Sequence, residues 1–91
     1  MSEFYYRVKD DSMTGDRIFC GDEVLVRVTE TVTKNDICAI MSEVDISQLE
    51  FRRIENQSGG YLLIPSNPEV RRETRDKIHI VGKIIMAYKN T

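Results

Sequence analysis

The chain has 91 residues, of which 41% are hydrophobic and 31% are charged, and its formal net charge at pH 7 is -2. This composition excludes a disordered chain and predicts one globular domain spanning residues 1–91. The charge argues against a nucleic-acid surface, which normally carries a basic face. The N-terminus lacks a basic segment followed by an apolar core, and no apolar run approaches the roughly 20 residues that span a bilayer. We therefore expect a cytoplasmic protein without a membrane anchor.

Period-two patterning of apolar residues dominates the N-terminal half and predicts strands. Residues 4–8 are aromatic and β-branched, and residues 23–28 place Val24, Val26 and Val28 on one face. Between these strands we expect a polar turn and a short helical turn at residues 14–18. Residues 37–41 are apolar throughout, which favours a strand buried on both faces.

The C-terminal half continues with hairpins. Residues 48–55 alternate, a Gly-rich loop at 56–60 leads into a strand at 61–64, and Pro65 ends that strand. We expect a charged, solvated loop at residues 70–77, because acidic residues interleave with Arg71, Arg72 and Arg75. A final strand at 78–88 bends at Gly82. Met13 and Met41 are predicted to fill the core.

Cysteine and histidine are too few and too scattered for a metal site. Cys20 and Cys38 form no CxxC pair, and the single His79 cannot complete a zinc set with them. We expect reduced thiols, no metal and no cofactor.

Six segments in order resemble the LexA-like peptidases of the S24 family, the C-terminal domains of SOS and phage-type repressors. The first reads YRVKDDSM and the second RIFCGDEVLV. The resemblance implies a mostly β fold of twisted antiparallel sheets and hairpins with very little helix, as in LexA and signal peptidase. It also implies a single C-terminal domain, with the helix-turn-helix and the cleavage segment absent from this chain. The matching segments are residues 6–13, 17–26, 34–39, 49–54, 62–68 and 80–85.

The resemblance places Ser12 at the nucleophile position and Arg52 at the position of the general-base lysine. The backbone N–H groups of Asp11 and Ser12 fall where the family holds the oxyanion. Because a guanidinium stays protonated in proteins, Arg52 cannot take the serine proton, and the site is expected to be inactive. Ser12 would then be only a turn residue, and Lys9 is a less favoured substitute base because it is expected to be solvated.

Two positions for Arg52 remain open from the sequence. Its stem could cover apolar surface with the charged head in water, or the residue could fill the cleft and bond a carboxylate such as Asp10, Asp11 or Glu50.

Two functions follow from the resemblance. The first is the dimerisation and regulatory domain of a DNA-binding repressor, paired as a homodimer through about Ile84 to Tyr88 and contacting DNA only through the absent N-terminal domain. An antirepressor or a RecA-like activator would then be its partner. The alternative is an active serine autopeptidase that cleaves itself to derepress, and a UmuD-like polymerase partner is a third reading.

Overall fold

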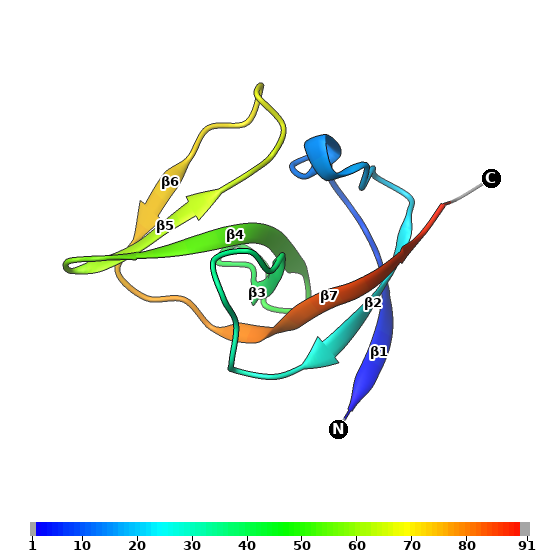
Figure 1. Ribbon diagram of the computed structural model, residues 1–91, viewed down its shortest axis with the longest axis horizontal. Helices are drawn as coiled ribbons and strands as arrows, with labels where there is room; N and C mark the ends of the chain where they lie inside the picture. Colours follow the sequence, from blue (N-terminus) through cyan, green and yellow to red (C-terminus); the bar gives the residue numbers. More distant parts are fainter. Residues whose placement is uncertain (1, 90–91) are drawn as a thin grey trace.

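Seven strands and one short 3₁₀ turn make up the computed structural model, which describes residues 2–89 (Figure 1). The predicted mostly β fold with very little helix is confirmed. Within this range no helix is long and apolar enough to cross a membrane. The strands are β1 (Glu3–Arg7), β2 (Glu23–Val28), β3 (Cys38–Met41), β4 (Leu49–Gln57), β5 (Gly60–Ile64), β6 (Glu73–Arg75) and β7 (Ile80–Tyr88), and the 3₁₀ turn η1 is Thr14–Asp16.

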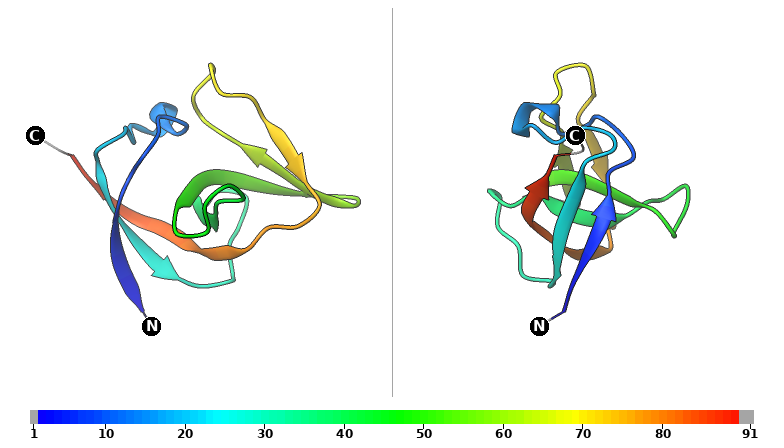
Figure 2. Two further views of the ribbon diagram at one scale, coloured as in Figure 1. Left: turned by 180° about the vertical axis from the view of Figure 1, so that it is seen from behind. Right: turned by 90° about the vertical axis from the view of Figure 1, so that its right-hand side faces the viewer.

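The strands join in one antiparallel sheet in the order β1-β2-β7-β3-β4-β5-β6. β1 and β2 lie at one end of the molecule and β5 and β6 at the other, as the views in Figures 1 and 2 show. The last strand, β7, lies between β2 and β3 and so connects the two ends.

Gly82 allows the crowded contact at the centre of β7. A Cβ atom at this position would lie 2.1 Å from the backbone oxygen of Arg27 on β2. Pairing slips by one residue nearby, between Ala39 and Ile40 on the β3 side. The predicted bend at Gly82 therefore coincides with a close backbone approach that excludes any side chain.

The core consists of two clusters on either side of β3. Ala39 belongs to the first cluster, whereas Cys38 and Ile40 belong to the second, and all three side chains are fully buried. The predicted burial of this strand on both faces is thus confirmed, because successive strand residues point to opposite sides. The first cluster comprises Val8, Met13, Ile18, Val24, Val26, Ala39 and Phe51, and the second Cys38, Ile40, Ile54 and Leu63.

Two local predictions were wrong. The charged segment at residues 70–77 contains β6, which pairs with β5. Met13 fills the core as predicted, whereas Met41 is only half-buried.

Both cysteines are free thiols; Cys20 is exposed and Cys38 buried. Burial raises the pKa of the Cys38 thiol to about 11, so this group stays protonated near neutrality.

Candidate functional site

Ser12 lies in the loop between β1 and β2, here called the serine loop (residues 9–17), and it is 3% exposed. Its carbonyl oxygen accepts hydrogen bonds from the backbone N–H groups of Ser66 and Asn67, each at 3.0 Å. The close packing of the two segments requires Gly15, since a Cβ atom there would lie 2.3 Å from the Ser66 oxygen. The segment after β5 therefore holds the serine in place.

The two aspartates before Ser12 shape the backbone around it. The Ser12 N–H donates to Oδ1 of Asp10 at 3.0 Å. Asp11 accepts a bond from the Cys20 N–H at 2.8 Å, and its carbonyl accepts one from the Asn67 side-chain amide at 2.8 Å. One of the two N–H groups that the resemblance assigns to an oxyanion is thus already bonded to a carboxylate.

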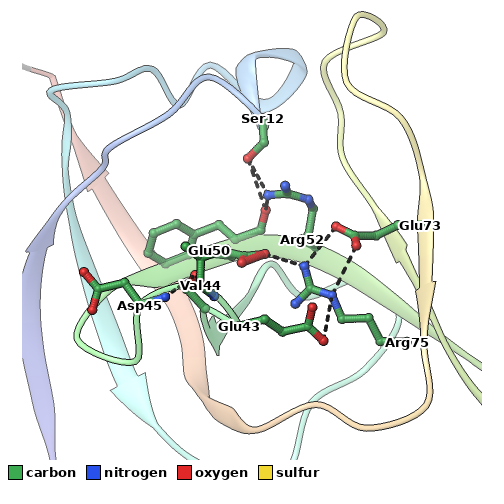
Figure 3. A network of polar contacts seen from close by, with 10 residues as sticks. Ser12, Glu43, Val44, Asp45, Glu50, Arg52, Glu73 and Arg75 are labelled. Carbon is green, nitrogen blue, oxygen red and sulfur yellow. Dashed lines mark hydrogen bonds and ion pairs between the residues drawn. The ribbon is translucent and has the colours of Figure 1, made fainter.

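Arg52 extends from β4 to Ser12 on the serine loop, as Figure 3 shows. Its Nη1 lies 2.7 Å from Ser12 Oγ and 2.8 Å from the Phe51 carbonyl oxygen. The Ser12 hydroxyl donates to the same carbonyl, with 3.3 Å between the oxygens. Ser12 Oγ, Arg52 Nη1 and the Phe51 carbonyl oxygen are therefore bonded to one another, and the serine oxygen accepts a hydrogen bond from a guanidinium.

Arg52 lines a cleft as one expectation held, but its head neither lies in open water nor bonds a carboxylate. The residue is only 8% exposed, so its guanidinium is not in open water. Within residues 2–89 it forms no ion pair with Asp10, Asp11 or Glu50, and its recorded hydrogen bonds go to uncharged oxygens. The turn around Ser12 brings the hydroxyl to Arg52, a long-range contact that strand periodicity alone does not reveal.

No lysine of the described chain bonds the Ser12 hydroxyl, whose partners are Phe51 and Arg52. Lys9 lines the cleft, but it is exposed and makes no recorded bond to Ser12. Lys83 pairs with Asp36, and Lys89 pairs with Asp22. Because a lysine becomes a neutral base at ordinary pH only when it is desolvated, an exposed Lys9 is a poor candidate.

Arg75 forms a second buried cation beside this pair (Figure 3). Its side chain is 8% exposed, and Nη2 lies 2.7 Å from Glu50 and 2.9 Å from Glu73, with Glu43 at 3.7 Å from Nε. Burial opposes the charge, but hydrogen bonds to Glu73 and Glu50 outweigh it and raise the pKa of Arg75. The prediction of a solvated loop was wrong here, because three carboxylates make burial of this arginine tolerable.

The two arginines border a cleft of about 680 Å³. The cleft runs along the start of β4 and is also lined by Lys9, Asp10, Gln48 and Leu49. The cleft is open to solvent, and its volume falls within the range of small-molecule sites. Among the described residues, no cluster of three His, Cys, Asp or Glu side chains is placed to hold a metal ion.

Sequence reasoning brought Ser12 and Arg52 together but missed the residues that hold them. Asn67 lay inside a segment quoted for the resemblance, yet its bond to Asp11 was not anticipated. Asp10 carried a usable signal, since an aspartate two residues before a backbone N–H commonly bonds it in an Asx turn. Arg75 carried no such signal.

The sequence profile described as Peptidase S24-like matches residues 2–85. The chain is 33% identical over 91 residues to the LexA repressor of Geobacter metallireducens, covering 96% of this chain and 44% of that protein. It is 33% identical to the LexA repressor of an Exiguobacterium species over 82 residues, covering 90% of this chain and 39% of the relative. The LexA repressor of Staphylococcus aureus is 32% identical, with coverages of 94% and 41%. The chain thus spans less than half the length of these relatives.

Proposed function

This chain belongs to the Peptidase S24-like family, and from that premise we propose that it is the dimerisation and regulatory domain of a cytoplasmic DNA-binding repressor, with an inactive serine site. Residues 1–91 would form the C-terminal domain, and a separate N-terminal helix-turn-helix would contact the operator. The net charge of -2 is consistent with DNA contacts made elsewhere in such a protein.

One observation carries the proposal of inactivity, namely the bond from Arg52 Nη1 to Ser12 Oγ at 2.7 Å. A serine hydroxyl becomes a useful nucleophile when a neighbouring base removes its proton. A guanidinium stays protonated and donates to the oxygen instead. The geometry therefore keeps a nucleophile and its partner in contact but lacks the acceptor that proton transfer requires.

The dimerisation proposal is supported by the end of β7. β3 pairs with β7 over Ile80–Lys83, and the Ile84 N–H donates to the Ile37 carbonyl just before β3, so within the described chain β7 has no partner on this side beyond Ile84. Met86 and Tyr88 are 54% and 40% exposed, and Tyr5 packs against Tyr88 with 6.0 Å between ring centroids. An unpaired strand edge flanked by exposed apolar side chains suits pairing with a second copy. Two copies would place two DNA-binding domains on a palindromic operator.

An inactive site would require a route to derepression other than self-cleavage. We propose a protein partner, either an antirepressor or a RecA-like activator acting without cleavage. Such a partner would need to bind the dimer and change its affinity for the operator.

The test compares three forms of the parent repressor with the segment upstream of Ser12 present: wild type, Ser12→Ala and Arg52→Lys. Each is incubated from about pH 7 to about pH 10, and intact masses are followed over time. We expect cleavage in Arg52→Lys alone, rising with pH as the buried amine loses its proton. The double variant Ser12→Ala/Arg52→Lys serves as the control and should stay intact.

The opposite outcome supports the alternative function. If the wild type cuts itself and Ser12→Ala does not, the chain is an active autopeptidase that uses another base. If every form stays intact at every pH, Ser12 is only a turn residue, and a lysine at position 52 does not restore cleavage.

A further inference from the structure

Arg52 carries a buried positive charge that no carboxylate of the described chain neutralises. It is 8% exposed, and its two recorded hydrogen bonds use only Nη1 and end on uncharged oxygens. Nε is enclosed without a partner, and Nη2 has no recorded bond within residues 2–89. Three of the five N–H donors of a guanidinium are therefore unused. Buried cations are normally paired, because an unpaired one loses hydration without compensation.

The neighbouring carboxylates are engaged elsewhere. Glu50 and Glu73 bind Arg75, and Asp10 accepts the Ser12 N–H. The cleft thus divides into one end where Glu43, Glu50 and Glu73 surround Arg75 and another where Arg52 has no counter-ion (Figure 3). Lys9, on the same cleft and exposed, adds a second positive charge.

We propose that this end of the cleft is a binding site for the carboxylate of a peptide, with Arg52 as its anchor. A carboxylate fits the planar donor face of a guanidinium and forms charge-assisted hydrogen bonds with it. The volume of about 680 Å³ is far larger than a bare anion needs, and Leu49 and Gln48 offer mixed apolar and polar walls to flanking residues. The ligand chemistry is shared by a peptide C-terminus and by an Asp or Glu side chain.

This inference deepens the proposed function, because it rests on the same cleft having lost its cleavage chemistry. Replacement of a neutral base by a permanent cation would convert the site from one that cuts a peptide bond into one that retains a charged peptide group. An antirepressor could then dock through an acidic residue or its own C-terminus.

The experiment titrates three acetylated probes into the 91-residue chain and follows backbone and Arg52 Nε–H signals by NMR. The probes are tetra-alanine with a free C-terminal carboxylate, its C-terminal amide, and the same amide with glutamate in place of one internal alanine. We expect at least one carboxylate probe to shift the Arg52 signals and to bind about tenfold more tightly than the plain amide. Tighter binding of the free acid would identify a peptide C-terminus as the ligand. Tighter binding of the glutamate-containing amide would identify an acidic side chain.

Variants assign the binding to Arg52. Arg52→Gln should weaken carboxylate binding about tenfold or more, whereas Arg72→Gln, an equal charge change on an exposed residue, should leave it unchanged. If Arg52→Gln does not fold, Arg52→Lys keeps a cation and should retain weaker binding without the guanidinium geometry. Equal binding of all three probes, no binding of either carboxylate probe, or unchanged binding by a folded Arg52→Gln would overturn the inference.

Mass spectrometry of the same samples separates this inference from the proposed function. Probe binding without hydrolysis supports both the carboxylate-binding site and the proposed inactivity. Hydrolysis of a probe by the wild type would overturn the proposed inactivity and, with it, the inference that the site only retains peptide. Absence of both binding and hydrolysis would overturn the inference alone.

Discussion

Arg53 of β4 and Asp16 of η1 form a two-point ion pair that ties the serine loop to the sheet. Nη1 lies 2.7 Å from Oδ2, and Nη2 lies 2.9 Å from Oδ1. The consecutive residues Arg52 and Arg53 thus both contact the serine loop, the first through the Ser12 hydroxyl and the second through a carboxylate. These two contacts hold the loop on β4. One guanidinium donates to a neutral hydroxyl, and the other binds a charged carboxylate.

The Asp16–Arg53 pair predicts a pH-dependent stability. The hydrogen bond from Arg53 lowers the pKa of Asp16, although burial opposes it. A carboxyl whose pKa is lowered on folding stabilises the protein above its unfolded pKa and loses that contribution as the pH falls through the folded pKa. We expect the free energy of unfolding to fall by about 0.5–1 kcal/mol from this pair below about pH 4. Urea denaturation between about pH 2 and about pH 7, the range in which carboxyls titrate, measures this effect. The free energy of unfolding should depend less steeply on pH in Asp16→Asn than in the wild type.

Loss of the Arg75 guanidinium should destabilise the protein strongly. Arg75→Met would leave Glu50, whose side chain is 17% exposed, without its ion pair. We expect a loss of about 3 kcal/mol in the free energy of unfolding, typical of removing one partner from a buried pair. Glu43→Gln is the comparison, because its side chain is 64% exposed and its contact should contribute less than about 1 kcal/mol. Similar losses in the two variants, measured by chemical denaturation, would contradict this account of the network.

Asp10 should contribute to the serine turn through its bond to the Ser12 N–H. We expect Asp10→Ala to cost about 1 kcal/mol of unfolding free energy, because a buried donor loses its acceptor. Asp10→Asn keeps an acceptor oxygen and should lose less. Thermal unfolding of the two variants provides the measurement, and a larger loss for Asn than for Ala would argue against the turn role.

Gly82→Ala should distort the centre of the sheet. The added methyl group would meet the Arg27 backbone oxygen at 2.1 Å, and a backbone atom cannot rotate away as a side chain can. We expect a loss of about 1–3 kcal/mol, the range for forcing atoms into a packed region. At Gly60→Ala the nearest backbone oxygen, that of Arg75, would lie 2.6 Å away, so the loss there should be smaller. Equal unfolding free energies for wild type and Gly82→Ala would exclude this close approach.

The proposed dimer predicts a concentration-dependent mass. Met86→Lys places a charge beside the end of β7 and should weaken dimerisation about tenfold or more. Val44→Lys, on the β3–β4 loop and 97% exposed in the wild type, is the matched control and should leave dimerisation unchanged. Sedimentation equilibrium distinguishes the outcomes, and a monomeric wild type at all concentrations would contradict the dimer proposal.

Strand positions were largely predictable from the sequence, because alternating or continuous apolar residues mark them directly. β3 is the clearest case, since Cys38, Ala39 and Ile40 are all buried. β6 was missed because its residues are charged and polar, and pairing with β5 rather than burial of apolar side chains defines it. Arg75 was missed for a related reason, since its partners come from residues 43, 50 and 73 and meet only in the folded sheet.

The site was predictable only in part. The resemblance paired Ser12 with Arg52, and the pair was predicted to be inactive because a guanidinium stays protonated. It did not predict that Arg52 would donate to the hydroxyl itself, because that contact depends on how the serine loop packs against residues 65–67. Strand alternation predicts which face of the sheet a side chain occupies. It does not predict how far that side chain lies from a residue on a distant loop, such as Ser12.

The central place of β7 has a consequence for the order of folding. Without residues 80–88, the described chain divides into a β1–β2 hairpin and a separate β3–β6 meander that share no strand pairing. During synthesis on the ribosome, β2 and β3 would therefore expose unpaired edges until β7 emerges and enters between them. Formation of the complete sheet is thus a late event that depends on contacts between distant parts of the chain, and a nascent chain paused before β7 would be vulnerable to pairing with other strands.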